Sequence, residues 1–254
     1  MKGAVLLEDV EKRYGGPHET AAVAGVSLDV APGELVAIVG ASGCGKSTLL
    51  RVLAGFEQHT GGRVEVAGRP VRGPGPDRGV VFQDYGLFPW LSVAENVRFG
   101  LRRRGLPRAE VRERAAAMVE TVGLTRFADR FPGELSGGMQ QRVAIARVLA
   151  NDPAVLLMDE PFGALDALTR TQMQHELRRL HVETGTTVLF VTHSIEEAVY
   201  LAHRVVVMTG GASHGVPGSV RAVVPVDLVG ERDVNAADFN AIEREIAALV
   251  HAPA

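Results

Sequence analysis

The sequence has one cysteine, no long apolar run and no excess of positive charge, and each of these absences excludes a class of protein. The single cysteine, Cys44, forms no disulfide within the chain, so nothing indicates an oxidising compartment. No apolar run approaches the roughly 18 to 20 residues that span a bilayer, and residues 1–8 lack the apolar core of a secretory signal. If the protein works at a membrane, another chain must cross it.

The balance of charge is slightly acidic. A formal net charge of −3 supplies no general positive field that would neutralise nucleic-acid phosphates, so nucleic acid is not expected as the main partner. The local basic run at 102–104 is interpreted as a solvated helix end. With 254 residues, 46% hydrophobic and 22% charged, the chain has a globular composition and can form one large or two small domains.

A glycine-rich stretch follows an apolar run at 35–39, typical of a buried strand, and precedes helical spacing at 48–54. The stretch matches the G-x-x-x-x-G-K-[ST] phosphate loop of P-loop NTPases. Glycines let backbone N–H groups turn towards phosphate oxygens, and the start of the helix adds N–H groups and a positive dipole end. The nucleotide-binding residues expected in this loop are Gly40, Ala41, Ser42, Gly43, Cys44, Gly45, Lys46, Ser47 and Thr48.

Two side chains of this loop have specific expected roles. Lys46 is expected to reach the β- and γ-phosphates, and Ser47 to give its hydroxyl to Mg²⁺. The alternative, a chance glycine-rich turn, is disfavoured by the strand before the loop and the helix after it. Cys44 is a candidate for reaction with thiol reagents because it lies in this loop, but not for catalysis.

Other polar residues come directly after predicted strands: Gln83, Asp159 with Glu160, and His193. Ligands bind at the carboxyl ends of the strands in open parallel α/β sheets, so these side chains are expected near the phosphate loop. Any one of them alone is explained as a turn residue, and the acidic pair as a salt-bridged loop. Beside a phosphate loop, Asp159 is instead expected to serve Mg²⁺ and Glu160 to act as general base towards the attacking water.

The rest of the pattern places a helical region between two halves of an α/β core. Residues 4–39 alternate in short runs and indicate mostly antiparallel strands. An S-x-x-E capping box at Ser92 opens the helical region, and a second is expected at Ser194. The remaining expected elements are strands at 63–66, 79–82, 155–158, 187–191, 205–208 and 220–229, and helices at 108–122, 136–149, 169–183, 194–203 and 236–250, the last with Phe239, Ile242, Ile246 and Leu249 on one side.

The segment Leu135–Arg142, with sequence LSGGMQQR, resembles the LSGGQ-type signature of ABC ATPases. Ser136 is expected to cap a helix, and Gly137 and Gly138 to leave its N-terminal N–H groups open to a second anion. One chain does not easily close both anion sites on one nucleotide. A two-fold, head-to-tail, ATP-dependent homodimer does, with each signature helix covering the partner's phosphate loop.

The resemblance extends to about residue 210 and implies an α/β fold, a P-loop NTPase (RecA-like) core with an N-terminal antiparallel β subdomain and an inserted α-helical subdomain. It implies ATP and Mg²⁺ as cofactors, stacking of Tyr14 on adenine, sensing of Mg²⁺ and water by Gln83, and contact of His193 with the γ-phosphate. The loop that ends at Asp166 would communicate across the dimer. Gln140 and Ser194 depart from the family pattern without removing a catalytic group. The expected ATPase domain is 1–230, with its helical subdomain at about 88–152, and 231–254 is a short C-terminal helical extension.

A finer resemblance, to importer ATPases of the nitrate, sulfonate and taurine group, rests on residues 82–97, 159–166 and 194–198. It implies a peripheral protein on the cytoplasmic face of the cell membrane, partnered by an integral membrane permease and, indirectly, by a periplasmic or extracellular solute-binding protein. The apolar run at 85–90 is either core or a docking surface for the permease. The alternatives are a soluble ABC ATPase acting on ribosome or nucleic acid, and a regulatory subunit without turnover.

Overall fold

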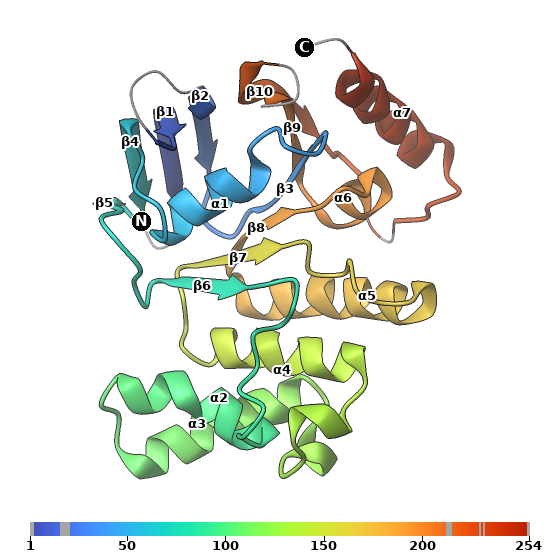
Figure 1. Cartoon of the computed structure of the whole chain (residues 1–254). Helices are drawn as coiled ribbons and strands as arrows, with labels where there is room; N and C mark the ends of the chain where they lie inside the picture. Colours follow the sequence, from blue (N-terminus) through green and yellow to red (C-terminus); the bar gives the residue numbers. More distant parts are fainter. Residues whose placement is uncertain (1–2, 16–20, 212–214, 229, 231, 253–254) are drawn as a thin grey trace.

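The computed structural model describes residues 3–15, 21–211, 215–228, 230 and 232–252. One ten-stranded sheet runs through the molecule in the order β5-β4-β1-β2-β10-β9-β3-β8-β7-β6. In Figure 1 the antiparallel part of the sheet lies at the top, and the helical region lies below β6 and β7. The expected α/β fold with an antiparallel β part and an inserted helical part is confirmed.

The central strands are parallel, so their carboxyl ends meet at one edge of the sheet. Neighbouring strands pair in parallel from β9 through β3, β8 and β7 to β6. In β3, β7 and β8 almost all residues are buried, which explains why these strands are continuous apolar runs without alternation. The bounds are β3 (Leu35–Gly40), β6 (Arg78–Val81), β7 (Val155–Asp159), β8 (Thr187–Val191) and β9 (Arg204–Gly211).

The antiparallel strands extend the sheet on the other side of β9. These are β1 (Val5–Arg13), β2 (Ala21–Val30), β4 (Gly61–Val66), β5 (Arg69–Pro70) and β10 (Val216–Pro225). Strand β10 begins within the stretch 211–219 that the sequence presents as a loop, so the predicted start at 220 and end at 229 are wrong. Pairing of Val216 with Gly211 and of Ser219 with Thr209 on β9 outweighs the turn-rich composition.

Helices cover both faces of the sheet and form the inserted region. The helices of the inserted region are α2 (Val93–Arg103), α3 (Arg108–Thr121), the short turns η1 (Thr125–Phe127) and η2 (Pro132–Glu134), and α4 (Gly137–Leu149). The others are α1 (Lys46–Ala54), α5 (Ala167–Thr184), α6 (Ile195–Leu201) and α7 (Ala237–His251). None of the helices that the structure describes has the length and apolarity required to cross a bilayer.

One predicted capping box is complete and the other is half formed. At α2 the Ser92 side chain accepts from the Glu95 N–H, and the Glu95 carboxylate accepts in return from the Ser92 N–H. At α6 the Ser194 hydroxyl accepts from the Glu197 N–H, but the carboxylate of Glu197 accepts instead from the Thr192 hydroxyl, 2.6 Å away. The Thr192 hydroxyl therefore takes the place of the Ser194 N–H as the donor to the Glu197 carboxylate.

The C-terminal helix packs on the core with the expected side. Phe239 and Ile246 are fully buried, and Ile242 and Leu249 pack partly buried against the same apolar cluster. Ahead of α7, the Arg232 guanidinium donates to the carbonyls of Val199 and Ala202, each at 2.7 Å. These carbonyls belong to the last turn of α6, which leaves them without helical partners, so the arginine caps the helix.

Two histidines lie together at the amino end of β3. His203 Nδ1 accepts from the Leu35 N–H at 2.9 Å, and His181 Nε2 donates to the Gly33 carbonyl at 3.0 Å. Burial lowers the pKa of both rings, and for His203 the charges of Arg232 and Arg178 add to this lowering while Glu34 opposes it. Each ring therefore binds a proton more readily in the unfolded chain than in the folded one. The stability that the neutral rings contribute is fully present above the unfolded pKa, near 6.5, and is lost as pH falls through the lower pKa of the folded state.

The free energy of unfolding should therefore decrease between pH 7 and pH 5, by at most about 1.4 kcal/mol per pH unit for each histidine. Asparagine places an acceptor near the position of Nδ1 and does not titrate, so His203→Asn should flatten this slope. Urea titrations at a series of pH values measure it, with His251→Asn, at the exposed end of α7, as the control. A slope unchanged by His203→Asn would contradict the assignment.

Candidate nucleotide site

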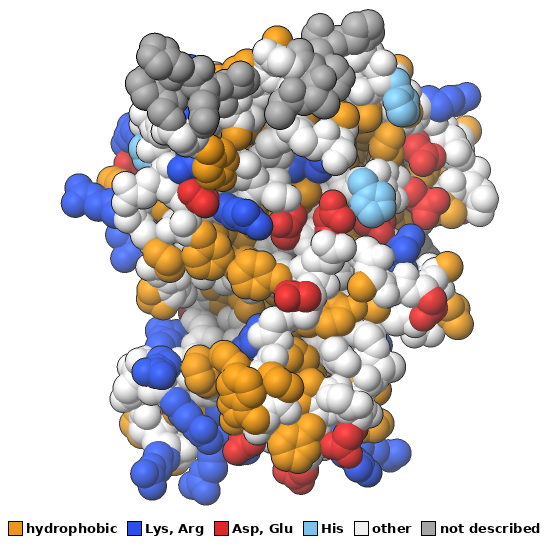
Figure 2. All heavy atoms as spheres, in the orientation of Figure 1, with side chains coloured by type: hydrophobic (Ala, Val, Ile, Leu, Met, Phe, Trp, Pro, Cys, Tyr) orange, Lys and Arg blue, Asp and Glu red, His pale blue; other side chains and the backbone are white. Residues whose placement is uncertain are grey.

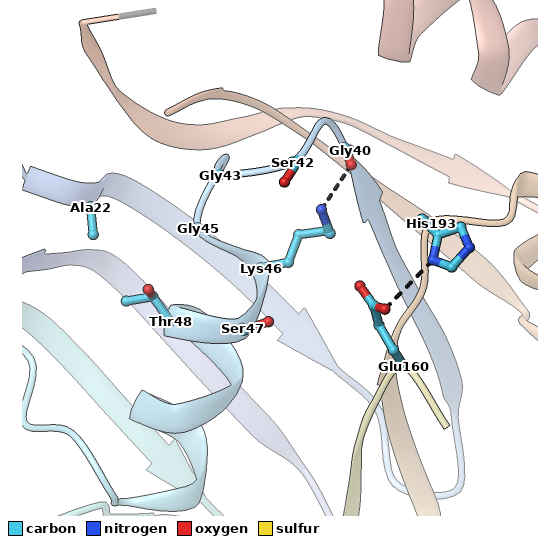
Figure 3. A pocket seen from close by; sticks show the side chains of 10 residues that line it. All are labelled: Ala22, Gly40, Ser42, Gly43, Gly45, Lys46, Ser47, Thr48, Glu160 and His193. Carbon is cyan, nitrogen blue, oxygen red and sulfur yellow. Dashed lines mark hydrogen bonds and ion pairs between the residues drawn. The ribbon is translucent and has the colours of Figure 1, made fainter. Parts of the chain in front are cut away.

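A cavity of about 470 Å³ opens at the carboxyl edge of the central strands. Figure 3 shows the phosphate loop and the start of α1 on one side of this cavity, with Glu160 and His193 facing them from the ends of β7 and β8. The lining residues are Ala22, Gly40, Ser42, Gly43, Gly45, Lys46, Ser47, Thr48, Glu160 and His193. The structure thus brings together predicted residues from three distant parts of the sequence.

The loop before α1 needs glycine at two positions. Gly40 has φ 152°, and a Cβ there would overlap the Met208 carbonyl of β9. Gly45, at the N-cap of α1, has φ 95°, and a Cβ there would overlap the Val23 side chain. No side chain of the described residues caps α1, so its first N–H groups are open to an anion in the cavity.

Lys46 and Ser47 are held by the loop and by β7. The Lys46 ammonium, almost completely buried, donates to the carbonyls of Gly40 and Ala41 at 2.8 and 3.0 Å. Figure 3 shows its side chain folded back over the loop towards Gly40. The Ser47 hydroxyl donates to Asp159 Oδ1 at 3.0 Å. A hydroxyl and a carboxylate at this distance provide the oxygen ligands that Mg²⁺ prefers.

Glu160 and His193 approach each other across the cavity from the loop. Glu160 Oε2 lies 3.6 Å from His193 Nδ1, and the Glu160 N–H donates to the Val191 carbonyl at 2.9 Å. Glu160 has φ 45°, an uncommon conformation for a residue with a side chain. Strain of this kind concentrates at functional sites, where the surrounding structure enforces it.

Gln83 joins this side of the site, although it is not among the residues that line the cavity. Its Nε2 lies 3.4 Å from the point where a Cβ at Gly163 would be, and Glu160 Oε2 lies 3.7 Å from the same point. The amide and the carboxylate therefore flank Gly163. A glycine at this position leaves room for both side chains, a role that the sequence pattern does not reveal.

The signature segment and Asp166 lie outside the cavity of their own chain. Ser136 caps α4 by accepting from the Met139 N–H at 3.4 Å, while Gly137 is exposed. A Cβ at Gly138 would lie 2.6 Å from the Thr169 side chain, which fixes α4 against α5. Asp166 caps α5. Its carboxylate accepts hydrogen bonds from the N–H and the hydroxyl of Thr169, and both bonds lower the pKa of the carboxyl.

Tyr14 lies outside the cavity lining, so the structure does not bring this predicted residue to the others. Its ring is 41% exposed, and the Lys12 ammonium lies 4.7 Å from the ring centroid. This exposure leaves one face of the residue open to solvent, so Tyr14 is not part of the apolar core. Ala22, at the start of β2, does line the cavity and was not predicted, because a small apolar residue in a strand carries no chemical signal.

Cys44 differs from the expectation of a reagent-accessible thiol. It is completely buried, and burial raises the pKa of its thiol, opposed by the charge of Lys46 3.9 Å away. A glycine-rich loop is exposed on average, but here the Cys44 side chain points inward and joins an apolar cluster with residues of β3 and α1.

A free helix N-terminus and a lysine over the glycine-rich loop form a site suited to the phosphates of a nucleotide, with a serine–aspartate pair and a glutamate beside it. These features define the chain as a P-loop nucleotide hydrolase.

Comparison with known proteins places the chain within this class. Residues 23–163 match the family model described as ABC transporter. A putative ATP-binding protein of Brucella abortus is 51% identical over 90% of this chain and 85% of its own. The taurine import ATP-binding protein TauB of Chromobacterium violaceum is 52% identical over 82% of this chain and 79% of its own.

A solved structure of an ATP-binding cassette, dimeric and bound to ADP and phosphate, has a TM-score of 0.73 and 34% identity over 88% of this chain and 99% of that one. The chain belongs to the ABC transporter family, as one of its ATP-hydrolysing cassettes, and the predicted resemblance to the nitrate, sulfonate and taurine importer group is confirmed.

The buried thiol leads to a test of the loop conformation. Cys44 in the native chain should react with an aromatic disulfide reagent at least about 100-fold more slowly than in urea, because reaction requires the loop to open. Absorbance of the released thiolate gives both rates, and Cys44→Ser provides the blank. Rapid labelling without denaturant would show that the loop exposes this residue.

Proposed function

We propose that this chain binds and hydrolyses MgATP at the interface of a head-to-tail homodimer and drives solute uptake through a separate membrane permease. The observation that carries the proposal is the hydrogen bond from Ser47 to Asp159, with Glu160 immediately after it and facing the phosphate loop. In this proposal Ser47 and Asp159 are the metal ligands, and Glu160, which lines the same cavity of about 470 Å³ as Ser47, is the base.

The proposal gives a role to residues in and around the cavity. The open N–H groups of the phosphate loop and the Lys46 ammonium bind the phosphates, and Ser47, Asp159 and Gln83 hold Mg²⁺. The metal, when bound, neutralises charge that develops on the phosphate oxygens. Glu160 accepts a proton from the attacking water, and His193, 3.6 Å from it, orients that carboxylate and contacts the γ-phosphate. Tyr14 would stack on the adenine base.

The dimer follows from the position of the signature segment. Ser136 and Gly137 are exposed at the N-terminus of α4 and do not line the cavity of their own chain. In a two-fold arrangement they would close the partner's cavity over ATP, and Asp166 would lie at the same interface. The dimeric relative bound to ADP and phosphate supports this assembly.

An apolar groove supports the permease as a partner. The groove, of about 720 Å³, lies between the segment after β6 and helices α2 and α4, and Phe82, Phe88 and Phe99 are among its lining residues. The sequence allows the run at 85–90 to be either core or docking surface, and its residues differ in this respect. Tyr85 is buried in the core, whereas Trp90 is 70% exposed. Arg147 supports the turn by donating to the carbonyls of Tyr85 and Gly86. An apolar groove with aromatic walls suits a short amphipathic helix.

The remaining features of the proposal concern location and organisation. The chain would sit on the cytoplasmic face of the cell membrane, with an external solute-binding protein delivering nitrate, a sulfonate, taurine or a similar small solute to the permease. TauB, a taurine import protein, supports that choice of solutes. Residues 1–230 would form the ATPase domain, with 88–152 as its helical subdomain and 231–254 as an extension.

Glu160→Gln should bind ATP but hydrolyse it about 100- to 1,000-fold more slowly, because the amide does not accept the proton from water. Release of phosphate measures turnover, and size-exclusion chromatography with MgATP measures the dimer that the slow variant should accumulate. Glu196→Gln, on α6 and outside the cavity, is the control with the same change of charge. Turnover of the Glu160 variant at the parent rate would refute the assignment of the base.

Phe88→Ala should abolish assembly with the permease and leave ATP binding by the isolated chain unchanged, because Phe88 packs between Trp90 and Phe99 in the groove. Phe127→Ala, at a ring that is 40% exposed and not among the groove residues, should assemble normally. Co-purification of the tagged permease with each variant measures assembly. Equal recovery with both variants would exclude the groove as the docking site.

A further inference from the structure

A second cavity, of about 680 Å³, lies where α2 ends and α3 begins, outside the nucleotide site. We call it the arginine pocket. Its lining consists of four arginines and two apolar residues: Arg98, Arg102, Leu106, Arg108, Val111 and Arg112. Val111 is buried and Leu106 is half-buried, so the pocket has an apolar part beneath its guanidinium groups.

The charge around the arginine pocket contrasts with the chain as a whole. Residues 98–114 contain seven arginines and two glutamates, whereas the chain has a net charge of −3. Figure 2 shows Lys and Arg side chains gathered at the lower left of the molecule, over α2 and α3. A concave surface that concentrates one sign of charge raises the local concentration of the opposite ion.

The arginines outside the pocket have partners, and those inside do not. Arg104 donates to the Asn151 carbonyl at 2.5 Å, Arg103 lies over the Phe99 ring, and Arg114 pairs with Glu110 at 2.6 Å. By contrast, none of the four pocket arginines forms an ion pair or a side-chain hydrogen bond with another described residue. The Nε of Arg98 is buried without any hydrogen-bond partner among these residues.

One carboxylate close to the pocket arginines, that of Glu95, is already engaged. The Glu95 carboxylate accepts a hydrogen bond from the Ser92 N–H, and this bond is the main reason why the pKa of the carboxyl is lowered. The charges of Arg102 and Arg98 lower it further. In addition, Pro107 precedes α3 and no side chain caps this helix in the described structure, so its first N–H groups lie open beside Arg108. Guanidinium groups and helix N-termini both favour phosphate oxygens.

We propose that the arginine pocket binds a small molecule carrying two or more phosphate groups, with Arg102, Arg108 and Arg112 as the anion ligands and Leu106 and Val111 contacting its apolar part. Arg102 is exposed at the end of α2, as the predicted solvated helix end requires, and its role as an anion ligand is part of this proposal. The volume lies within the range of small-molecule sites. The phosphates could belong to a free metabolite or to a lipid headgroup, and the inference is independent of the function proposed above.

The test uses inorganic pyrophosphate as the probe, titrated calorimetrically in Mg²⁺-free buffer. Every chain carries Lys46→Gln, which weakens phosphate binding at the nucleotide site. Arg102→Gln with Arg108→Gln should weaken binding at least about tenfold, because two charge-assisted contacts are lost. Arg114→Gln with Arg126→Gln removes the same charge outside the pocket and should change the affinity less than about twofold.

A second arm identifies the source of the phosphates. Sedimentation with vesicles containing cardiolipin, a lipid that carries two phosphates, compared with phosphatidylcholine alone, measures binding to lipid headgroups by the same chains. Loss of pyrophosphate binding in the pocket variant supports a free metabolite, and loss of vesicle binding alone supports a lipid headgroup. Equal effects of the pocket and control variants, or no binding of either probe by the parent, would overturn the proposal.

Discussion

The site depends on the hydrogen bond between the Ser47 hydroxyl and Asp159, which joins the start of α1 to the end of β7. Strand β8 separates β3 from β7 in the sheet, so this 3.0 Å contact spans the strand between them. It forms only if all three strands are in register, and their almost completely buried side chains provide that register. The apolar core thus determines the positions of Ser47 and Asp159, the proposed metal ligands, to within a hydrogen-bond length.

The sequence predicts the parts of the site that are set by local backbone and by strand direction. Gly40, Gly45 and Lys46 belong to one continuous loop, and parallel strands carry Asp159 and His193 to the same edge, so a periodic pattern is enough to place them together. The order of the strands and the helical insertion follow from the same patterns and from the family resemblance.

Other features depend on contacts between distant segments, which no local pattern contains. Cys44 is buried because β9 and β10 cover the loop, and β10 itself forms in a turn-rich stretch because β9 offers it a partner. The return bond of the cap at Ser194 fails because Thr192 competes for Glu197. A run of arginines does not reveal which cavity each member lines: Arg102 lines the arginine pocket, whereas Arg103 lines the apolar groove.

Gly218 and Gly211 make the shape of the phosphate loop depend on strands that come much later in the sequence. A Cβ at this residue would overlap the Cys44 carbonyl, and one at Gly211 would overlap that of Gly43, so the backbones of β10 and β9 press directly on the phosphate loop. Strands β9 and β10 follow the loop by more than 150 residues, so a ribosome makes the loop well before the strands that shape it. A nascent chain therefore carries the nucleotide-binding motif before it has a finished nucleotide site, and gains that site only after β9 and β10 have been synthesised.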